Sequence, residues 1–136
     1  MRSRLIIAAA AVVLLPALAT PATGAPAAAE PGPWTGKATS KDRSFKYGKV
    51  TFRVRGSTIR NLKIQAVTVS GCGGLKDVVV PRLRIRGTRF SGAYEPVPGV
   101  DDTIIVRGRI SGGRATGTFT EGPTCVGEGR FTARAR

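Results

Sequence analysis

The side chains that could carry out catalysis form an incomplete set in this sequence. The chain has no histidine and only two cysteines, so it cannot form a Ser-His pair, a Cys-His pair or a histidine-bearing zinc site. None of its serines lies in a Gly-x-Ser-x-Gly or Ser-x-x-Lys motif. A carboxylate pair for glycoside hydrolysis would have to come from loop acids, namely Glu95, Asp101, Asp102 and Glu121. We therefore expect a protein that is not an enzyme, with no catalytic residue and no cofactor.

Six of the eight acidic residues lie in or beside the stretches expected to be long loops. They are Asp42, Asp77, Glu95, Asp101, Asp102 and Glu121. Calcium needs six to eight oxygen ligands, but no Asp-x-Asp-x-Asp spacing occurs, and aspartate is common in turns that bind no metal. We expect no metal site. Aromatic residues occur in the same stretches. If the long loops gather at one end of the fold, a specific ligand could bind there, and the candidate residues are Phe45, Tyr47, Tyr94, Asp101 and Asp102.

The arginines are the sharpest chemical feature of the chain. Six of them alternate with apolar residues in three successive hairpins and are expected to face outward: Arg53, Arg55, Arg84, Arg86, Arg107 and Arg109. The planar guanidinium group suits phosphate and carboxylate, which predicts attraction of polyanions. A GC-rich genome would also place arginine wherever a strand needs a solvated residue, and this alternative stays open. Because aromatic side chains for base stacking are not interleaved with the arginines, we expect no sequence-specific nucleic-acid binding.

The first 29 residues have the order of a secretory signal peptide. Arg2 and Arg4 form a basic start, an apolar run over 5–15 follows, and small residues with proline come next. Cleavage after Ala19 or after Ala29 fits the small-x-small rule, and the choice between them stays open. An uncleaved anchor is the alternative, which the short apolar run disfavours. We expect a secreted, extracellular protein.

Cleavage near Ala29 leaves a chain of suitable length for one domain. Residues 30–33 are expected to be a flexible lead-in, and residues 34–136 to form the domain. Loss of the two basic residues of the leader lowers the formal net charge from +14 to +12. Two cysteines in a small exported chain, Cys72 and Cys125, imply one structural disulfide.

Two stretches of the domain share one hairpin pattern. Phe52–Ile59 and Leu83–Phe90 both read apolar, Arg, apolar, Arg, Gly, hydroxyl, any residue, apolar. A two-residue turn that begins with glycine is typical of a β-hairpin. Such a turn pairs Val54 with Ile59 in the first hairpin and Ile85 with the last residue of the second, apolar against apolar.

Two irregularities are expected in the neighbouring strands. The apolar positions after Ile59 shift phase to Leu62 and Ile64, which predicts a β-bulge near Arg60–Asn61. Pro81 cannot donate a ladder hydrogen bond, so we expect an edge position or a bulge in the strand over 78–86.

The expected strands number eight, and their connections alternate in length. Long loops are expected at 40–47, 70–77, 95–100 and 121–127, and tight turns at 56–57, 87–88 and 111–113. In an antiparallel meander the long loops share one end, which brings Cys72 and Cys125 to the same end, as a disulfide requires. We therefore predict an all-β domain of about eight antiparallel strands, either an up-and-down barrel or a flattened barrel (sandwich), with one disulfide.

The glycines, apolar residues and cysteines also form a spaced pattern. It reads Cys72-Gly73, then Gly108-x-Ile110, Ala115-x-Gly117-x-Phe119, Cys125 and Phe131-Thr132-Ala133. In this pattern the chain resembles small secreted actinobacterial β-domain proteins of uncharacterised function. The resemblance implies the all-β architecture and assigns no catalytic residue.

These observations favour a secreted, non-enzymatic binding or surface-associated protein. Its basic surface would associate with anionic envelope or extracellular polymers such as teichoic acid or extracellular DNA, or with an anionic membrane surface. The alternative is a small-molecule-binding barrel or an inhibitor-like, protein-binding module that uses the long-loop end. The sequence leaves the oligomeric state open.

Overall fold

The computed structural model describes residues 24–41, 45–69, 77–99, 102–123 and 127–136. These residues form eight β-strands and no helix, which confirms the prediction of an all-β domain. The strands are β1 (Gly32–Ser40), β2 (Phe45–Arg55), β3 (Thr58–Val69), β4 (Val78–Arg86), β5 (Arg89–Tyr94), β6 (Asp102–Ser111), β7 (Arg114–Pro123) and β8 (Gly127–Ala135). Within the described ranges, no helix is long and apolar enough to cross a membrane.

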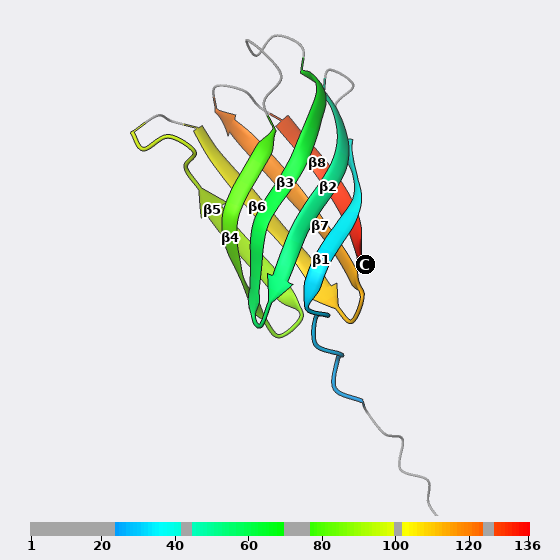
Figure 1. Cartoon of the computed structure of the whole chain (residues 1–136). Helices are drawn as coiled ribbons and strands as arrows, with labels where there is room; N and C mark the ends of the chain where they lie inside the picture. Colours follow the sequence, from blue (N-terminus) through cyan, green and yellow to red (C-terminus); the bar gives the residue numbers. More distant parts are fainter. Residues whose placement is uncertain (1–23, 42–44, 70–76, 100–101, 124–126) are drawn as a thin grey trace, which may run out of the picture.

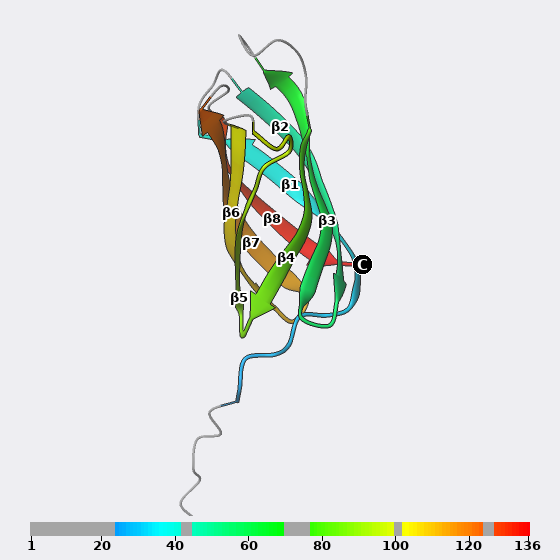
Figure 2. The ribbon, with the colours of Figure 1, turned by 90° about the vertical axis from the view of Figure 1, so that its left-hand side faces the viewer.

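The strands close into a barrel, which decides between the two architectures that the sequence allowed. Each strand pairs antiparallel with the next one, and β1 pairs with β8 from Trp34–Ala135 to Ser40–Gly129 (Figure 1). The turns after β2, β4 and β6 lie at one end of the barrel, here called the tight-turn end. The ends of β1, β3, β5 and β7 gather at the opposite end, here called the long-connection end (Figures 1 and 2).

The predicted hairpin registers are confirmed. Val54 lies opposite Ile59 across β2 and β3, and Ile85 lies opposite Phe90 across β4 and β5. The glycine that begins each two-residue turn has a positive φ, 54° at Gly56 and 59° at Gly87. These are backbone conformations that glycine adopts without a steric penalty.

The bulge predicted in β3 is also confirmed. The pairing of β2 with β3 shifts register between Thr51 and Arg53, and Asn61, on the opposite strand, has a φ of 50°. Asparagine is among the few non-glycine residues that tolerate this left-handed conformation. The extra residue brings Leu62 onto the inner face, where it is 1% exposed.

Pro81 lies where β4 has a ladder on one side only. β4 pairs with β3 on both sides of the proline, through Val80 and Arg82. Its described pairing with β5 covers only Arg84–Arg86. The expectation of an edge position is therefore met locally, because the stretch of β4 around Pro81 has no β5 partner in this register.

The loop expected over 40–47 was wrong at both ends. β1 continues to Ser40 and β2 already begins at Phe45. Register shifts on either side of Tyr47 change the phase of β2, so this odd-numbered residue points inward together with the even-numbered Val50. A bulge that the alternation pattern did not reveal is the physical reason. The loop expected at 121–127 is shorter too, because β7 extends to Pro123.

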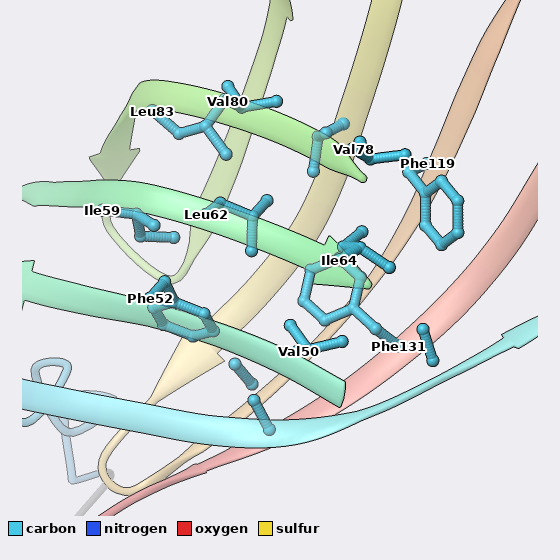
Figure 3. Packing of buried hydrophobic residues seen from close by; sticks show 14 of the residues in the cluster. Val50, Phe52, Ile59, Leu62, Ile64, Val78, Val80, Leu83, Phe119 and Phe131 are labelled. Atoms are coloured by element: carbon cyan, nitrogen blue, oxygen red, sulfur yellow. The ribbon is translucent and has the colours of Figure 1, made fainter. Parts of the chain in front are cut away.

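Apolar side chains fill the barrel interior (Figure 3). Every buried residue in the described ranges is hydrophobic or glycine, and none is polar or charged. Trp34 stacks on Phe52 with ring centroids 5.3 Å apart, and Phe90 lies 6.3 Å from Phe131. Burial of each large side chain contributes about 1.5–3 kcal/mol relative to leaving it exposed, so this interior is a major source of stability for the domain.

The segment before β1 is hydrogen-bonded to the tight-turn end. The backbone N–H of Glu30 donates to the carbonyl of Gly112 at 3.0 Å, and the N–H of Gly112 donates to the carbonyl of Ala27 at 3.2 Å. The hydroxyl of Ser111 also donates to Ala27 at 3.1 Å, and the indole of Trp34 donates to the carbonyl of Glu30 at 3.0 Å. The segment thus crosses the turn between β6 and β7 before the chain enters the barrel wall.

Candidate anion-binding surface

Arginine alternates with hydroxyl-bearing residues in one outward-facing row around the barrel. Direct cross-strand pairing links, from β2 round to β1, Arg55, Thr58, Arg84, Ser91, Arg107, Thr118, Arg130 and Thr39. All of them are exposed or partly exposed. Neighbouring strands lie about 4.8 Å apart, so successive arginines of this row are separated by one hydroxyl and by two strand spacings.

A second row, one step closer to the tight-turn end, carries more charge. It consists of Arg86, Arg89, Arg109, Thr116, Thr132, Lys37 and Lys49, in order from β4 round to β2. Its three arginines lie side by side on β4, β5 and β6, and Arg53, Arg60 and Arg82 form a similar trio on β2, β3 and β4. Like charges directly opposite each other destabilise a sheet. The outer wall therefore concentrates positive charge at some cost to folding.

Carboxylates do not neutralise these arginines within the described part of the chain. The ion pairs found there use lysines: Lys41 with Glu128 at 3.2 Å and Lys63 with Asp77 at 2.9 Å. None of the described arginines makes an ion pair with a described carboxylate. Because their counterions are exchangeable ions from solvent, an incoming polyanion can release them and gain free energy.

A groove crosses this wall over β5, β6, β7 and β8. It has a volume of about 930 Å³ and is open to solvent. Its outward-facing lining consists of the four arginines Arg89, Arg107, Arg109 and Arg130 and the four hydroxyl residues Ser91, Thr116, Thr118 and Thr132. We call these eight residues the arginine groove. Arg84, Arg86 and Arg89 line an adjoining hollow, so the cationic surface continues onto β4.

Two inward-facing glycines lie beneath the groove. Gly108 and Gly117 face each other across β6 and β7. A Cβ atom at Gly108 would lie 2.3 Å from the ring of Phe90, and one at Gly117 would lie 2.5 Å from the ring of Phe131. The absent side chains allow the two rings to pack directly against the inside of the wall, where both are 2% exposed. The wall is thin at this point, and the groove lies on its outer side.

The six arginines predicted from the sequence all lie exposed on the outer wall. Arg55, Arg84 and Arg107 share the first row, and Arg86 and Arg109 share the second. Arg53 belongs to the trio on β2, β3 and β4. Two members of the arginine groove, Arg89 and Arg130, were absent from that set. Arg130 could have been found, because it precedes the inward-facing Phe131 and must face outward by alternation.

The residues proposed for the long-connection end are only partly brought together. Tyr47 is inside the barrel, 5% exposed, with its ring edge-on to Phe119 at a centroid distance of 4.7 Å. Tyr94 pairs with Ile104 across β5 and β6, two residues from Asp102. One carboxylate oxygen of Asp102 and the hydroxyl of Tyr47 are buried without a hydrogen-bond partner in the described structure.

Three further predicted features lie outside the described residues. They are Asp101, the side chain of Phe45, and the two cysteines of the expected disulfide, Cys72 and Cys125. Among the described residues, no group of three or more cysteine, aspartate or glutamate side chains is placed to hold a metal ion.

Two groups near the long-connection end have shifted pKa values. Burial, with a contribution from the charge of Glu121, raises the pKa of Tyr47 to about 12. The hydrogen bond from Lys63 lowers the pKa of Asp77, and the backbone N–H of Ala66 donates a second hydrogen bond to this carboxylate at 3.0 Å. Asp77 therefore links β3 to the start of β4, whereas the Tyr47 hydroxyl stays neutral at physiological pH.

Comparison with known protein families, curated proteins and solved structures found no match to this chain.

Proposed function

We propose that this chain is a secreted, non-enzymatic protein that binds anionic polymers of a cell envelope or extracellular matrix through its arginine-bearing wall. The observation that carries the proposal is the arrangement of unneutralised arginines in two rows on the outside of the barrel, the first of which alternates arginine with hydroxyl residues. Guanidinium groups bind phosphate, sulfate and carboxylate through paired hydrogen bonds. Repeated along a surface, they suit a ligand that repeats its charges.

The distribution of acids supports the same reading. Among the described acids, Asp77, Glu95, Asp102 and Glu121 lie at or near the long-connection end, and Glu30 lies at the segment before β1. No described acid is a member of either arginine row, and Glu128, two residues before Arg130 on β8, is paired with Lys41. A polyanion approaching the wall meets mainly positive charge, which speeds association at low salt.

The filled interior gives no support to a ligand bound inside the barrel. Barrels that carry a small molecule in their interior enclose a cavity for it, whereas aromatic and aliphatic side chains fill this one (Figure 3). The alternative of a small-molecule or inhibitor-like site therefore rests on the long-connection end. The unpartnered Tyr47 hydroxyl and Asp102 oxygen favour it there, because buried polar atoms usually have a partner.

The test is retention of the purified domain on immobilised heparin and on immobilised teichoic acid over a salt series. We expect affinity to fall steeply with salt, with the slope of log K against log salt decreasing by roughly 0.7 for each phosphate contact removed. Replacing Arg84, Arg86, Arg107 and Arg109 by glutamine should flatten this slope and weaken retention.

A matched control replaces four exposed basic residues that belong to neither row. The variant Lys46→Gln, Arg114→Gln, Arg134→Gln, Arg136→Gln removes the same charge from positions outside both rows. Greater loss from the arginine set supports the proposal. Salt-independent retention, or no retention at all by the unaltered protein, would refute it.

A further inference from the structure

We infer that the arginine groove is a discrete subsite for a flexible polymer of phosphodiester-linked polyol units. This inference rests on the proposed function, and it narrows both the ligand class and the place where the ligand binds. The groove gathers four arginines and four hydroxyls within one hollow, and no acidic residue is among its lining. The rest of the wall carries arginine too, but the groove brings donors from four neighbouring strands, β5 to β8, into one hollow.

The register across β7 defines two seats for an anion. At the first seat, Thr118 lies between Arg107 and Arg130. A group placed above the threonine can accept a hydrogen bond from its hydroxyl and from a guanidinium on each side. Since arginine is long and flexible, two arginines two strands apart, about 10 Å at the backbone, can both reach an anion centred between them.

The second seat lies above Thr116. Arg109 is its neighbour on β6 and Thr132 its neighbour on β8, and Arg89 lies directly beyond Arg109 on β5. Thr116 and Thr118 are two residues apart on the same face of β7, so the seats are separated by about 6.7 Å. A short polyol linker of a few carbons spans successive phosphates at this order of distance.

The donors of each seat suit a tetrahedral phosphate better than a planar carboxylate. A carboxylate that accepts both N–H groups of one guanidinium fork has its oxygens engaged in one plane. A phosphodiester directs its oxygens out of a single plane, so one group can accept from a guanidinium on one strand and from a hydroxyl on the next. The alternation of arginine and threonine across β6, β7 and β8 provides both kinds of donor.

The same groove is poorly suited to bases and to bilayers. Binding of single-stranded nucleic acid relies on aromatic side chains that stack on bases, and the aromatic residues of the lining, Phe90 and Phe131, are each 2% exposed. Interfacial membrane binding uses exposed aromatic or aliphatic side chains that enter the lipid, and the outward lining consists of Arg, Ser and Thr alone. A polymer of phosphates and hydroxyl-bearing linkers needs neither feature.

The experiment measures binding of delipidated poly(glycerol phosphate) by calorimetry at fixed salt. The test variant is Arg107→Gln, Arg130→Gln, which removes both cations of the first seat. Its matched control is Arg53→Gln, Arg82→Gln, which removes equal charge from exposed positions outside the groove. We expect the test variant to lose about tenfold or more in affinity because two charge-assisted contacts disappear, and the control to lose about threefold or less because only long-range attraction changes.

A second pair of variants tests the hydroxyl. Thr118→Val keeps the branched shape of the residue and removes the donor at the seat, whereas Thr120→Val makes the same change two residues along β7, outside the groove. Only the former should weaken binding. All four variants alter exposed strand residues, and their unfolding temperatures, measured alongside, check that each barrel is intact.

The ligand class is tested with poly-L-glutamate, heparin and single-stranded DNA at matched charge concentration. Tighter binding of poly(glycerol phosphate) than of poly-L-glutamate or DNA, lost in the Arg107, Arg130 variant, supports the inference. Equal loss from both arginine pairs, or a preference for DNA or polyglutamate, overturns it while leaving polyanion binding in place. Tighter binding of heparin would assign the seats to sulfate and would overturn the phosphate assignment. Absence of binding to every polyanion overturns the proposed function as well.

Discussion

Replacing Tyr47 by phenylalanine should stabilise the domain. The hydroxyl is buried without a described hydrogen-bond partner, and a buried polar group in this position costs roughly 1–3 kcal/mol relative to its hydrated state in the unfolded chain. The hydroxyl packs against Gly127, where an added Cβ atom would lie 2.2 Å from the hydroxyl oxygen. Removal of the hydroxyl therefore leaves a small void. Loss of those packing contacts offsets part of the gain. We expect a net gain of about 1 kcal/mol at pH 7, or roughly 4 °C in unfolding temperature for a domain of this size.

The pH dependence of the unfolding free energy provides a second test of the buried Tyr47 hydroxyl. The pKa of Tyr47 is raised to about 12 in the folded protein, from an ordinary value of 10.0. Burial favours the neutral phenol in the folded state, so the unfolded chain ionises first as the pH rises. Ionisation of this group therefore leaves the free energy of unfolding unchanged below pH 10 and lowers it as the pH rises through 10 towards 12. In Tyr47→Phe this part of the alkaline decline should disappear.

The assay is urea unfolding followed by fluorescence of the single tryptophan, repeated between pH 7 and pH 11.5. Tyr94→Phe is the matched control, because it removes the same atom from the only other tyrosine, which is partly exposed. The control should change the unfolding free energy by less than about 0.5 kcal/mol. If Tyr47→Phe lowers stability by 1 kcal/mol or more at pH 7, the hydroxyl has a partner in solution, and the reasoning from an unpaired group is refuted.

Three further predictions concern the two cysteines, Gly108 and Asp77. Exported protein should show no free thiol in a colorimetric assay, because Cys72 and Cys125 are expected to form a bridge worth up to about 4 kcal/mol; two free thiols per native chain would contradict this. Gly108→Ala should lower stability by roughly 1–3 kcal/mol because its Cβ would meet a buried ring at 2.3 Å, whereas Ser91→Ala, at an exposed position of β5, should change stability by less than about 0.5 kcal/mol in the same thermal melts. Asp77→Asn should lower the free energy of unfolding by roughly 0.5–1 kcal/mol at pH 7. Because the pKa of Asp77 is lowered in the folded protein, the unaltered protein should lose this stability as the pH falls and the carboxylate is protonated, and the variant should not. An unchanged acid limb in the unfolding curve would contradict that assignment.

Local rules were sufficient for most of the barrel wall. The pairing of Val54 with Ile59 follows from a two-residue turn and from apolar alternation, and both signals lie within a few residues of each other. The bulge at Asn61 was visible as a phase shift between apolar residues on the same strand. In both of these cases the signals lay within one hairpin, and prediction and structure agree.

Features that depend on distant strands were less accessible. Closure of the barrel requires β1 to pair with β8. Residues as small as Gly36 and Ala133, which lie opposite each other, give little sequence signal for this pairing. Tyr47 was placed in a loop because the stretch over 40–47 is polar, and the register shifts that turn its side chain inward become visible only in the pairing of β2 with β3. The role of Arg130 depends on its alignment with Thr118 across β7 and β8. Alternation shows that this arginine faces outward, but only the register shows which side chains lie beside it.

The pairing of the first strand with the last has a consequence for rearranging the chain. The N–H of Arg136 donates to the carbonyl of Pro33 at 3.0 Å, so the two ends of the barrel wall already lie within hydrogen-bonding distance. A short glycine-rich linker between them would permit circular permutation, with new termini opened at the exposed turn between β4 and β5. Because that turn adjoins Arg86 and Arg89, a tag attached to the new terminus would stand beside the arginine groove. In such a permuted protein the same barrel would form from a chain that begins with β5 and ends with β4.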